Sequence, residues 1–275
     1  MTEAIELLRE RHHELLRLTL HRPAAANAIN RTIAMGLVQG LSEAMADETV
    51  RAVVITGAGD RAFSTGADIK SFLTAPPSLS DMWLTQRDLL LNRGLEVWKP
   101  VIAAVNGLCL GGGMTLLLAT DIRISASHAT FSLAEVKRGV IPGNGGTQRV
   151  LDQLPYAIGM EMLLTGDGID AETAARWGLV NKVVPREQLL ELAYTYARKI
   201  AANAPLAVQA AKELAVRARD TDLTTGLRIL QQSPTEFVAG HGVFVFGHQA
   251  LLPVTLEIGQ LLAVDRHIGP HRVGG

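Results

Sequence analysis

Residues 106–115 of the chain read NGLCLGGGMT, and an apolar run flanks them on each side. The preceding run, PVIAAV at 100–105, predicts a buried strand, and LLLA at 116–119 predicts a buried helix. Three consecutive glycines between a strand and a helix leave bare backbone N–H groups at the helix N-terminus, where negative charge is stabilised. The stretch therefore predicts a place for a bound anion or a developing oxyanion, unless the glycines serve only a tight turn.

The composition is that of an ordinary globular protein. The 275 residues, 48% hydrophobic and 19% charged, suffice for one large domain or a domain with an appendage. A net charge of −1 favours neither nucleic acid nor anionic membranes as partners. The single cysteine, Cys109, excludes an internal disulfide and fits a reducing compartment. Because we find no apolar signal segment and no apolar run of spanning length, we expect a cytoplasmic protein.

Strand-like and helix-like patterns alternate along the chain, roughly in the order strand, strand, helix, repeated with drift. We expect strands at 15–20, 52–56, 121–125, 129–133 and 179–184. We expect helices at 29–45, 80–98, 185–203 and 205–219, and a second glycine cluster at 143–146 that opens another helix. This order predicts an α/β fold with no sequence repeat or domain linker before residue 220.

One motif resembles a dinucleotide-binding fingerprint. Gly57, Gly59 and Ala62 match the pattern G-x-G-x-x-A after the predicted strand 52–56. That fingerprint requires a helix to begin at once, whereas residues 63–66, FSTG, interrupt with a second glycine turn. The sequence therefore argues against a nicotinamide or flavin site.

Two glycine turns, Gly66-Ala67 and 111–113, each follow a predicted strand. Backbone N–H groups from two separate loops can converge on one oxygen and form an oxyanion hole. Each such donor stabilises a transition state by about 2.7–4 kcal/mol. The alternative is that these glycines only permit tight turns and close packing.

Glu135 lies between a predicted strand end and the turn at 140–143, among apolar neighbours. A carboxyl group there can have a raised pKa and act as a general acid or base. The alternative is a solvated glutamate paired with Lys137 or Arg138. Other chemistry has less support: the histidines form no metal-ligand cluster, no serine lies in a G-x-S-x-G motif, and Cys109 reads as a small core residue.

Several motifs in fixed order, over roughly residues 10–228, together resemble the crotonase, or enoyl-CoA hydratase/isomerase, superfamily. They are Arg22-Pro23 with Asn27-Ala28, TGAG at 56–59, AFSTGADIK at 62–70, 100–107, 111–113, Asp121-Ile122-Arg123, IPGNGGTQR at 141–149, 164–166, 178–180 and Ala204-Pro205. The resemblance implies a crotonase-like spiral of ββα turns with a C-terminal helical region, assembled as a trimer or a dimer of trimers. It also implies an acyl-CoA substrate and no bound cofactor beyond CoA.

The resemblance assigns roles to particular residues. The N–H groups of Ala67 and Gly112 hold the thioester oxygen, and Glu135 and Thr115 occupy the catalytic positions. The loop 66–70 touches the CoA adenine and pantetheine. The full set of implied substrate contacts is Ala24, Ala26, Ser64, Gly66, Ala67, Asp68, Ile69, Lys70, Leu108, Gly111, Gly112, Thr115, Ala134, Glu135, Pro142 and Gly143.

The chain departs from the family pattern at Thr115, where hydratases commonly carry a second glutamate. A threonine can hydrogen-bond a water but cannot take its proton at neutral pH. The leading hypothesis is an enoyl-CoA hydratase/isomerase-type enzyme of fatty-acid metabolism, with Glu135 as sole general acid/base. The alternatives are a hydroxycinnamoyl-CoA hydratase-lyase or a double-bond isomerase that uses this one glutamate, and a non-catalytic acyl-CoA-binding protein of the same fold.

Two further departures concern the CoA contacts and the C-terminus. The segment 24–26 reads AAA where many relatives have a charged residue, which leaves Lys70, Arg22 or a neighbouring subunit to hold CoA. We expect a core at 1–203 and a trimerisation-type segment at 204–275 that is atypical after about 228. Residues 229–275 hold five charged residues and no lysine, consistent with either a reading-frame change or genuine divergence.

Overall fold

The computed structural model describes residues 5–70, 90–226, 238–239 and 242–243. The chain forms two compact units, Met1–Asp222 and Leu223–Gly275. In the second unit, the described strands β11 (Val238–Ala239) and β12 (Gly242–Val243) pair antiparallel. Most of the segment after 228 therefore lies outside the described residues.

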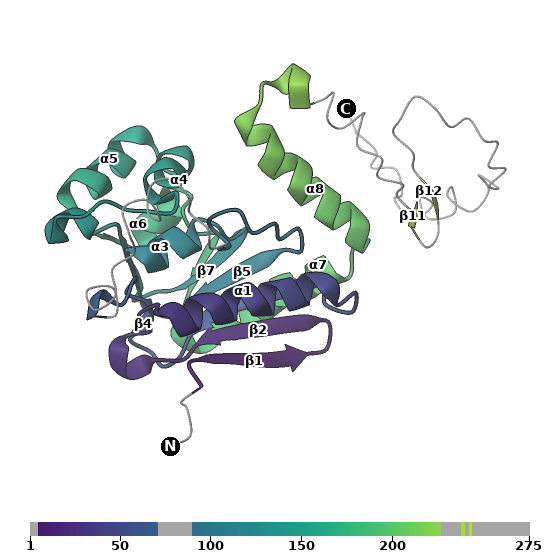
Figure 1. The fold of residues 1–275 in the computed structure, drawn as a ribbon, viewed down its shortest axis with the longest axis horizontal. Coiled ribbons are helices and arrows are strands. Elements are labelled where there is room, and N and C mark those ends of the chain that lie inside the picture. The colour runs from purple at the N-terminus through teal and green to yellow at the C-terminus, as the bar shows by residue number, and fades with distance from the viewer. Residues whose placement is uncertain (1–4, 71–89, 227–237, 240–241, 244–275) are drawn as a thin grey trace, which may run out of the picture. The chain divides into compact units, whose positions relative to one another are not determined.

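A six-stranded sheet forms the centre of the first unit (Figure 1), in the order β1-β2-β3-β5-β7-β10. Its strands are β1 (Leu7–His12), β2 (Leu15–Leu20), β3 (Ala52–Gly57), β5 (Val101–Val105), β7 (Ile122–Ala126) and β10 (Lys182–Val184). β1 runs antiparallel to β2, and the other neighbours pair in parallel. Every residue of β3 and β5 is buried, as expected of parallel strands covered on both faces.

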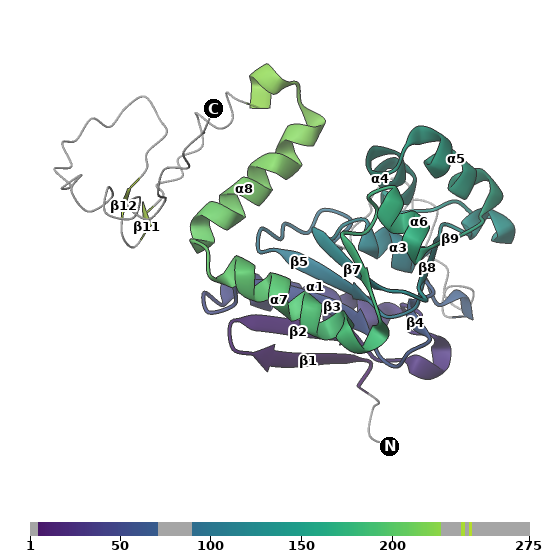
Figure 2. The ribbon, with the colours of Figure 1, turned by 180° about the vertical axis from the view of Figure 1, so that it is seen from behind.

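Two helices cover the two faces of this sheet. Helix α1 (Arg31–Ala46) lies across the face seen in Figure 1, and α7 (Leu189–Ala201) lies across the face seen in Figure 2. Because side chains alternate along a strand, Val53 of β3 packs in the cluster with α1, whereas Val54 packs in the cluster with α7. The sheet is thereby fixed in a sandwich from which the loops at its ends project.

A second, four-stranded sheet carries the loops of interest. Its order is β4-β6-β8-β9, with strands β4 (Ala62–Ser64), β6 (Leu108–Leu110), β8 (Thr130–Ser132) and β9 (Ile169–Asp170). The pairs β4–β6 and β6–β8 are parallel. The chain segments that leave the ends of these three strands therefore emerge side by side.

The remaining helices are short, apart from α8. They are α3 (Gly112–Leu117), α4 (Gly146–Gln153), α5 (Tyr156–Thr165), α6 (Ala171–Arg176) and α8 (Pro205–Arg217). Lys212 fastens α8 to the sheet, because its Nζ lies 2.6 Å from Asp121 Oδ2. Further along α8, the Arg217 guanidinium lies over the Trp98 ring, 5.0 Å from its centroid.

The predicted α/β class is confirmed, but two expected elements differ. The expected helix at 80–98 lies outside the described residues up to 89, and residues 90–98 are not helical. They form a tight turn in which the amide of Leu90 donates to the carbonyl of Arg93 and Gly94 adopts a φ of +75°. The strand expected at 179–184 begins only at Lys182, because the amide of Leu179 donates back to Ala174 at the end of α6. Across the described ranges, no helix combines the length and apolar character needed to cross a membrane.

Candidate functional site

Two backbone amides from separate loops lie close together beyond the ends of β4 and β6. A Cβ atom placed on Gly66 would lie 2.6 Å from the nitrogen of Gly112, and one placed on Gly112 would lie 3.2 Å from the nitrogen of Ala67. The nitrogens of Ala67 and Gly112 are therefore close neighbours. Ala67 is exposed and Gly112 is partly exposed, so this part of the fold borders solvent.

Neither amide is used by the secondary structure around it. Ala67 forms an isolated parallel bridge with Ile29, and that bridge uses the amides of Ile29 and Asp68, so the amide of Ala67 points away from it. Gly112 is the first residue of α3, and the first amides of a helix have no intrahelical acceptor. Neither N–H group is thus committed to the secondary structure beside it.

The glycines make this approach of two backbones possible. A Cβ on Gly113 would lie 2.4 Å from the carbonyl oxygen of Ser64, closer than real Cβ atoms come. Gly66 has a φ of +91°, which side chains rarely adopt. The sequence offered two explanations for the glycine turns, an oxyanion hole or close packing. They are compatible, because close packing is what brings the two amides together.

Glu135 begins a 3-10 turn (Glu135–Arg138) just after β8. Its carboxyl group lies against the same loop, because a Cβ on Gly111 would be 3.5 Å from Glu135 Oε1. Oε2 is buried and has no hydrogen-bond partner among the described residues. Burial raises the pKa of Glu135, and a hydrogen bond to backbone opposes this in part. Lys137 pairs instead with Asp167, at 2.6 Å, so it does not neutralise Glu135.

Thr115 lies one turn into α3 and is buried, with 2% of its surface exposed. Its hydroxyl donates to the carbonyl of Gly111 over 3.3 Å. Gly146, at the start of α4, packs against it so closely that a Cβ there would lie 2.8 Å from Thr115 Oγ1. The hydroxyl is thus held on the same turn that carries Gly112 and is bonded to Gly111, the residue against which the Glu135 carboxyl lies. Its position leaves little room for a longer side chain.

The other residues implied as substrate contacts fall into three groups. Exposed ones are Ala24, Ile69, Lys70 and Gly143, and partly exposed ones are Asp68, Leu108, Gly111 and Ala134. Buried ones are Ala26, Ser64, Gly66 and Pro142. The hydroxyl of Ser64 donates to the carbonyl of Asn27 at 2.8 Å and accepts from the amide of Gly66, so this side chain shapes the loop.

Two asparagines that the sequence reading left without a role hold the loop before β4. Asn27 Nδ2 donates to the carbonyls of Ala58 and Ala62, at 2.9 and 2.7 Å. Asn106 Nδ2 donates to the carbonyls of Gly59 and Ala62, and its Oδ1 accepts from the amide of Gly57. The segment 57–62 therefore leads into strand β4 rather than into a helix. In the sequence, the sign of this role is Asn106, a polar residue directly after the apolar run 100–105.

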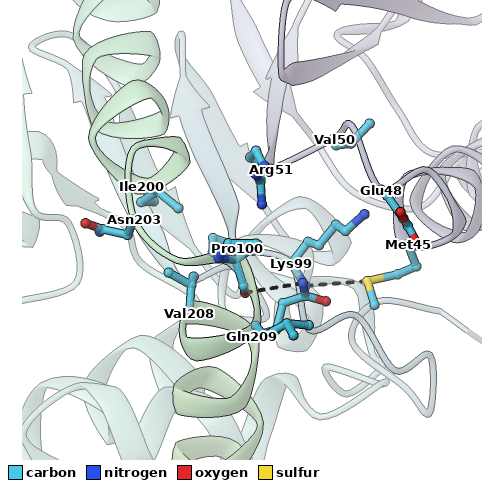
Figure 3. Close-up of a pocket in the computed structure, with 12 residues that line it drawn as sticks. Met45, Glu48, Val50, Arg51, Lys99, Pro100, Ile200, Asn203, Val208 and Gln209 are labelled. Atoms are coloured by element: carbon cyan, nitrogen blue, oxygen red, sulfur yellow. Dashed lines mark hydrogen bonds between the residues drawn. The ribbon is translucent and has the colours of Figure 1, made fainter. Parts of the chain in front are cut away.

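A separate cavity of about 460 Å³ lies at the opposite end of the parallel strands (Figure 3). Lys99 is the buried cation on its wall, and its Nζ donates to the carbonyls of Ala44 and Asp47, at 2.7 Å each, beyond the last turn of α1. Burial lowers the pKa of Lys99. Because the Lys99 ammonium group is already bonded to carbonyls at the C-terminal end of α1, we assign no chemistry to this cavity. No group of three or more potential metal ligands is present in the parts of the chain that the structure covers.

Comparison with known proteins agrees with this geometry. The family model described as enoyl-CoA hydratase/isomerase matches residues 10–243. The (E)-benzylidenesuccinyl-CoA hydratase of Thauera aromatica is 40% identical over 76% of this chain and 82% of its own length. The 2,3-dehydroadipyl-CoA hydratase of Escherichia coli is 39% identical over 81% and 86%, respectively. The crystal structure of an enoyl-CoA hydratase from Mycobacterium tuberculosis has a TM-score of 0.73 at 36% identity, over 82% and 87%.

The raised pKa of Glu135 predicts a pH-dependent gain in stability on its replacement. A carboxyl whose folded-state pKa exceeds its ordinary value near 4.5 stabilises the fold below that value, and this contribution is lost as pH rises through the raised pKa. We therefore expect Glu135→Gln to melt at a higher temperature than the wild type at pH 7.5, and at a similar temperature at pH 4. The measurement is thermal unfolding across this pH range.

The control for this measurement is Glu161→Gln, which removes an exposed carboxyl from the middle of α5. It should change the melting temperature little at either pH. A Glu135→Gln shift of equal size at both pH values would contradict a raised pKa, since it would then reflect packing alone.

Proposed function

The chain belongs to the enoyl-CoA hydratase/isomerase family, and we propose that it adds water across the double bond of an α,β-unsaturated acyl-CoA thioester. Its relatives are named as CoA hydratases, and the likeness covers most of both chains. It is thus an enoyl-CoA hydratase-type enzyme of the crotonase superfamily. The roles of individual residues in this reaction are proposals that rest on the geometry above.

The observation that carries the mechanism is the pair of amides at Ala67 and Gly112. When a nucleophile attacks the β carbon of an enoyl thioester, electrons move onto the thioester oxygen and form an enolate. Two N–H groups aimed at that oxygen stabilise the enolate more than the neutral substrate, by about 2.7–4 kcal/mol for each donor. The short helix α3 adds its positive end on the same side.

Glu135 is the group that moves protons. Its carboxylate takes a proton from the attacking water while the water oxygen bonds to the β carbon, and the carboxylic acid so formed then gives that proton to the α carbon. The elements of water are thereby added, and Glu135 returns to its starting state. A pKa raised by burial makes the carboxylate a stronger base, which suits this exchange.

Thr115 supports the water in this proposal. Its hydroxyl has one long bond to the carbonyl of Gly111 and retains acceptor capacity for a water beside Glu135. The same residue is the reason for a second candidate function. With one carboxyl, the site can also move a proton between the α and γ carbons, which is double-bond isomerisation, or release an aldehyde as a hydratase-lyase.

Assembly, location and cofactor use are parts of the same proposal. We propose a trimer or a dimer of trimers in the cytoplasm, and a reaction that uses CoA only as part of the substrate. Light scattering of the purified protein measures the assembly directly. A monomer would contradict the trimer and leave the reaction chemistry to be judged by the assays below.

The first test is a substrate panel with the wild type and Glu135→Gln. We expect hydration of at least one of crotonyl-CoA, cinnamoyl-CoA and 2,3-dehydroadipyl-CoA. The measurement is the decrease in ultraviolet absorbance as the double bond conjugated with the thioester is lost. The dehydroadipyl substrate is included because a relative is named for it. Glu135→Gln should lower kcat by roughly 10²–10⁴-fold, the usual contribution of a general acid/base. Conversion of 3-enoyl-CoA without hydration would favour the isomerase instead, and retained turnover in the variant would exclude the role of Glu135.

The second test removes one N–H group from the oxyanion hole. Gly112→Pro deletes the donor at the first position of α3, a helix position that suits the fixed φ of proline. Gly112→Ala keeps the N–H and adds a Cβ 3.2 Å from the nitrogen of Ala67, so it controls for added bulk. We expect kcat of the proline variant to fall roughly 10²–10³-fold below that of the alanine variant. Equal kcat values for the two would show that this amide does not contact the developing charge.

The third test concerns the hydroxyl of Thr115. Thr115→Val keeps the shape of the side chain and removes its hydrogen-bonding oxygen, whereas Thr115→Ser keeps the oxygen. We expect the valine variant to lose about tenfold in hydration, equivalent to about 1.4 kcal/mol, and the serine variant to lose much less. If valine and serine reduced hydration alike, packing against Gly146 would explain the effect and the water-holding role would be withdrawn.

A further inference from the structure

We propose that Arg22 and Asp68 are positioning residues that aim the amide of Ala67 at the substrate oxygen, an inference that rests on the proposed function. Neither residue supplies an amide of the proposed oxyanion hole or the proposed general acid/base. What links it to them is the backbone on both sides of Ala67.

The residues before and after Ala67 are both bonded to Ile29. The amide of Ile29 donates to the carbonyl of Gly66 at 2.7 Å, and the amide of Asp68 donates to the carbonyl of Ile29 at 2.9 Å. Gly66 itself adopts a left-handed conformation that offers no stiffness from a side chain. The direction of the Ala67 N–H therefore follows the position of the segment around Ile29.

Arg22 joins the two sides of this bridge. Its Nη1 lies 2.9 Å from Asp68 Oδ2 and also donates to the carbonyl of Ala28 at 2.9 Å. The side chains of Arg22 and Asp68 are only 20% and 15% exposed, so this charge-assisted contact is shielded from much of the solvent. One guanidinium nitrogen thus holds Asp68 beside the segment to which it is bridged.

The same guanidinium ties the bridge to rigid elements. Arg22 Nε lies 3.1 Å from Glu6 Oε1, and Glu6 Oε2 accepts from Asn30 Nδ2 at 2.6 Å. Asn30 in turn caps α1, because its Oδ1 accepts from the amide of Ile33. The chain of contacts therefore runs from the first turn of α1 and the residue before β1 to the residue that follows Ala67.

This arrangement has a catalytic consequence because oxyanion donors act over short distances. Reacting groups must be held to within about 0.5 Å, and a displacement of about 1 Å can cost roughly 10²-fold in rate. Arg22 already faces two carboxylates, Glu6 and Asp68, so its charge is balanced within the protein. A role in shaping the oxyanion hole fits this better than a role in holding a CoA phosphate.

The test compares Arg22→Gln and Asp68→Asn with a matched control, Arg17→Gln. Arg17 lies on β2, close in sequence to Arg22. Its side chain is also 20% exposed and also pairs with a carboxylate, that of Glu10. For the two positioning variants we expect kcat on the preferred enoyl-CoA to fall about 10–100-fold while KM changes less than about twofold. Arg22→Lys, which keeps the charge without the planar fork, should recover only part of the loss. Arg17→Gln should leave kcat nearly unchanged at a similar loss of melting temperature.

A second measurement, the binding of an enolate-forming thioester, tests the oxyanion hole directly. Acetoacetyl-CoA ionises to an enolate that absorbs in the ultraviolet, so the wild type should bind it as the enolate. Arg22→Gln should weaken that binding about tenfold or more while binding butyryl-CoA, which forms no stabilised enolate, as the wild type does.

The outcomes are distinguishable. A raised KM with unchanged kcat would show that Arg22 holds CoA, and losses equal to those of Arg17→Gln would show a structural pair; either result overturns this inference alone. A wild type that forms no enolate and converts no enoyl-CoA overturns the proposed function, and the inference with it.

Discussion

The site depends on the closeness with which two backbones pass each other beyond the parallel pair β4 and β6. At Ser64 and Gly113, and again at Gly66 and Gly112, an added Cβ would come within 2.4 and 2.6 Å of backbone atoms of the other loop. Glycine is therefore a steric requirement at positions 113 and 66. Because the loops approach so closely, the amides of Ala67 and Gly112 lie next to each other, and the Glu135 carboxyl lies against Gly111, the residue before Gly112.

Several buried or partly buried polar side chains near this site have hydrogen-bond or ion-pair partners. Asn27 and Asn106 share the carbonyl of Ala62, and Arg22 is held by two carboxylates. Against that background Oε2 of Glu135 stands out, since it has no hydrogen-bond partner among the described residues and a buried carboxyl oxygen without a partner costs stability. Proteins commonly accept such a cost where a group must remain available for chemistry.

The sequence predicted every strand of the central sheet except β1, but only β8 of the second sheet. Strands such as β3 and β5 are continuous apolar runs, because both of their faces are covered, and such runs are easy to recognise. Strand β1 reads LLRERH, with charged side chains suited to an edge, and β4 and β6 have only three residues each, so periodicity cannot reveal them. The helix expected at 80–98 failed within 90–98, where Gly94 permits a turn that a pattern of apolar residues does not indicate.

The candidate site shows the same division between local and long-range information. The glycine turns and Glu135 each admitted an ordinary structural explanation, and the resemblance to a family made their combination meaningful. The sequence could not show that Ala67 is bridged to Ile29 or that Arg22 lies across that bridge, because these contacts join segments some 40 residues apart. It also left open whether Arg22 binds CoA, and the two carboxylates beside it now favour a different role.

The placement of Glu135 also has a stereochemical consequence. Its carboxyl group lies on one side of the loop at Gly111, and a substrate whose carbonyl oxygen rests on the two amides would present one face of its double bond to that carboxyl. If the same carboxyl both accepts the proton of the water and returns it to the neighbouring carbon, oxygen and hydrogen are added to that one face. Under the proposed roles the addition is therefore syn, and the face that meets Glu135 sets the handedness of the alcohol.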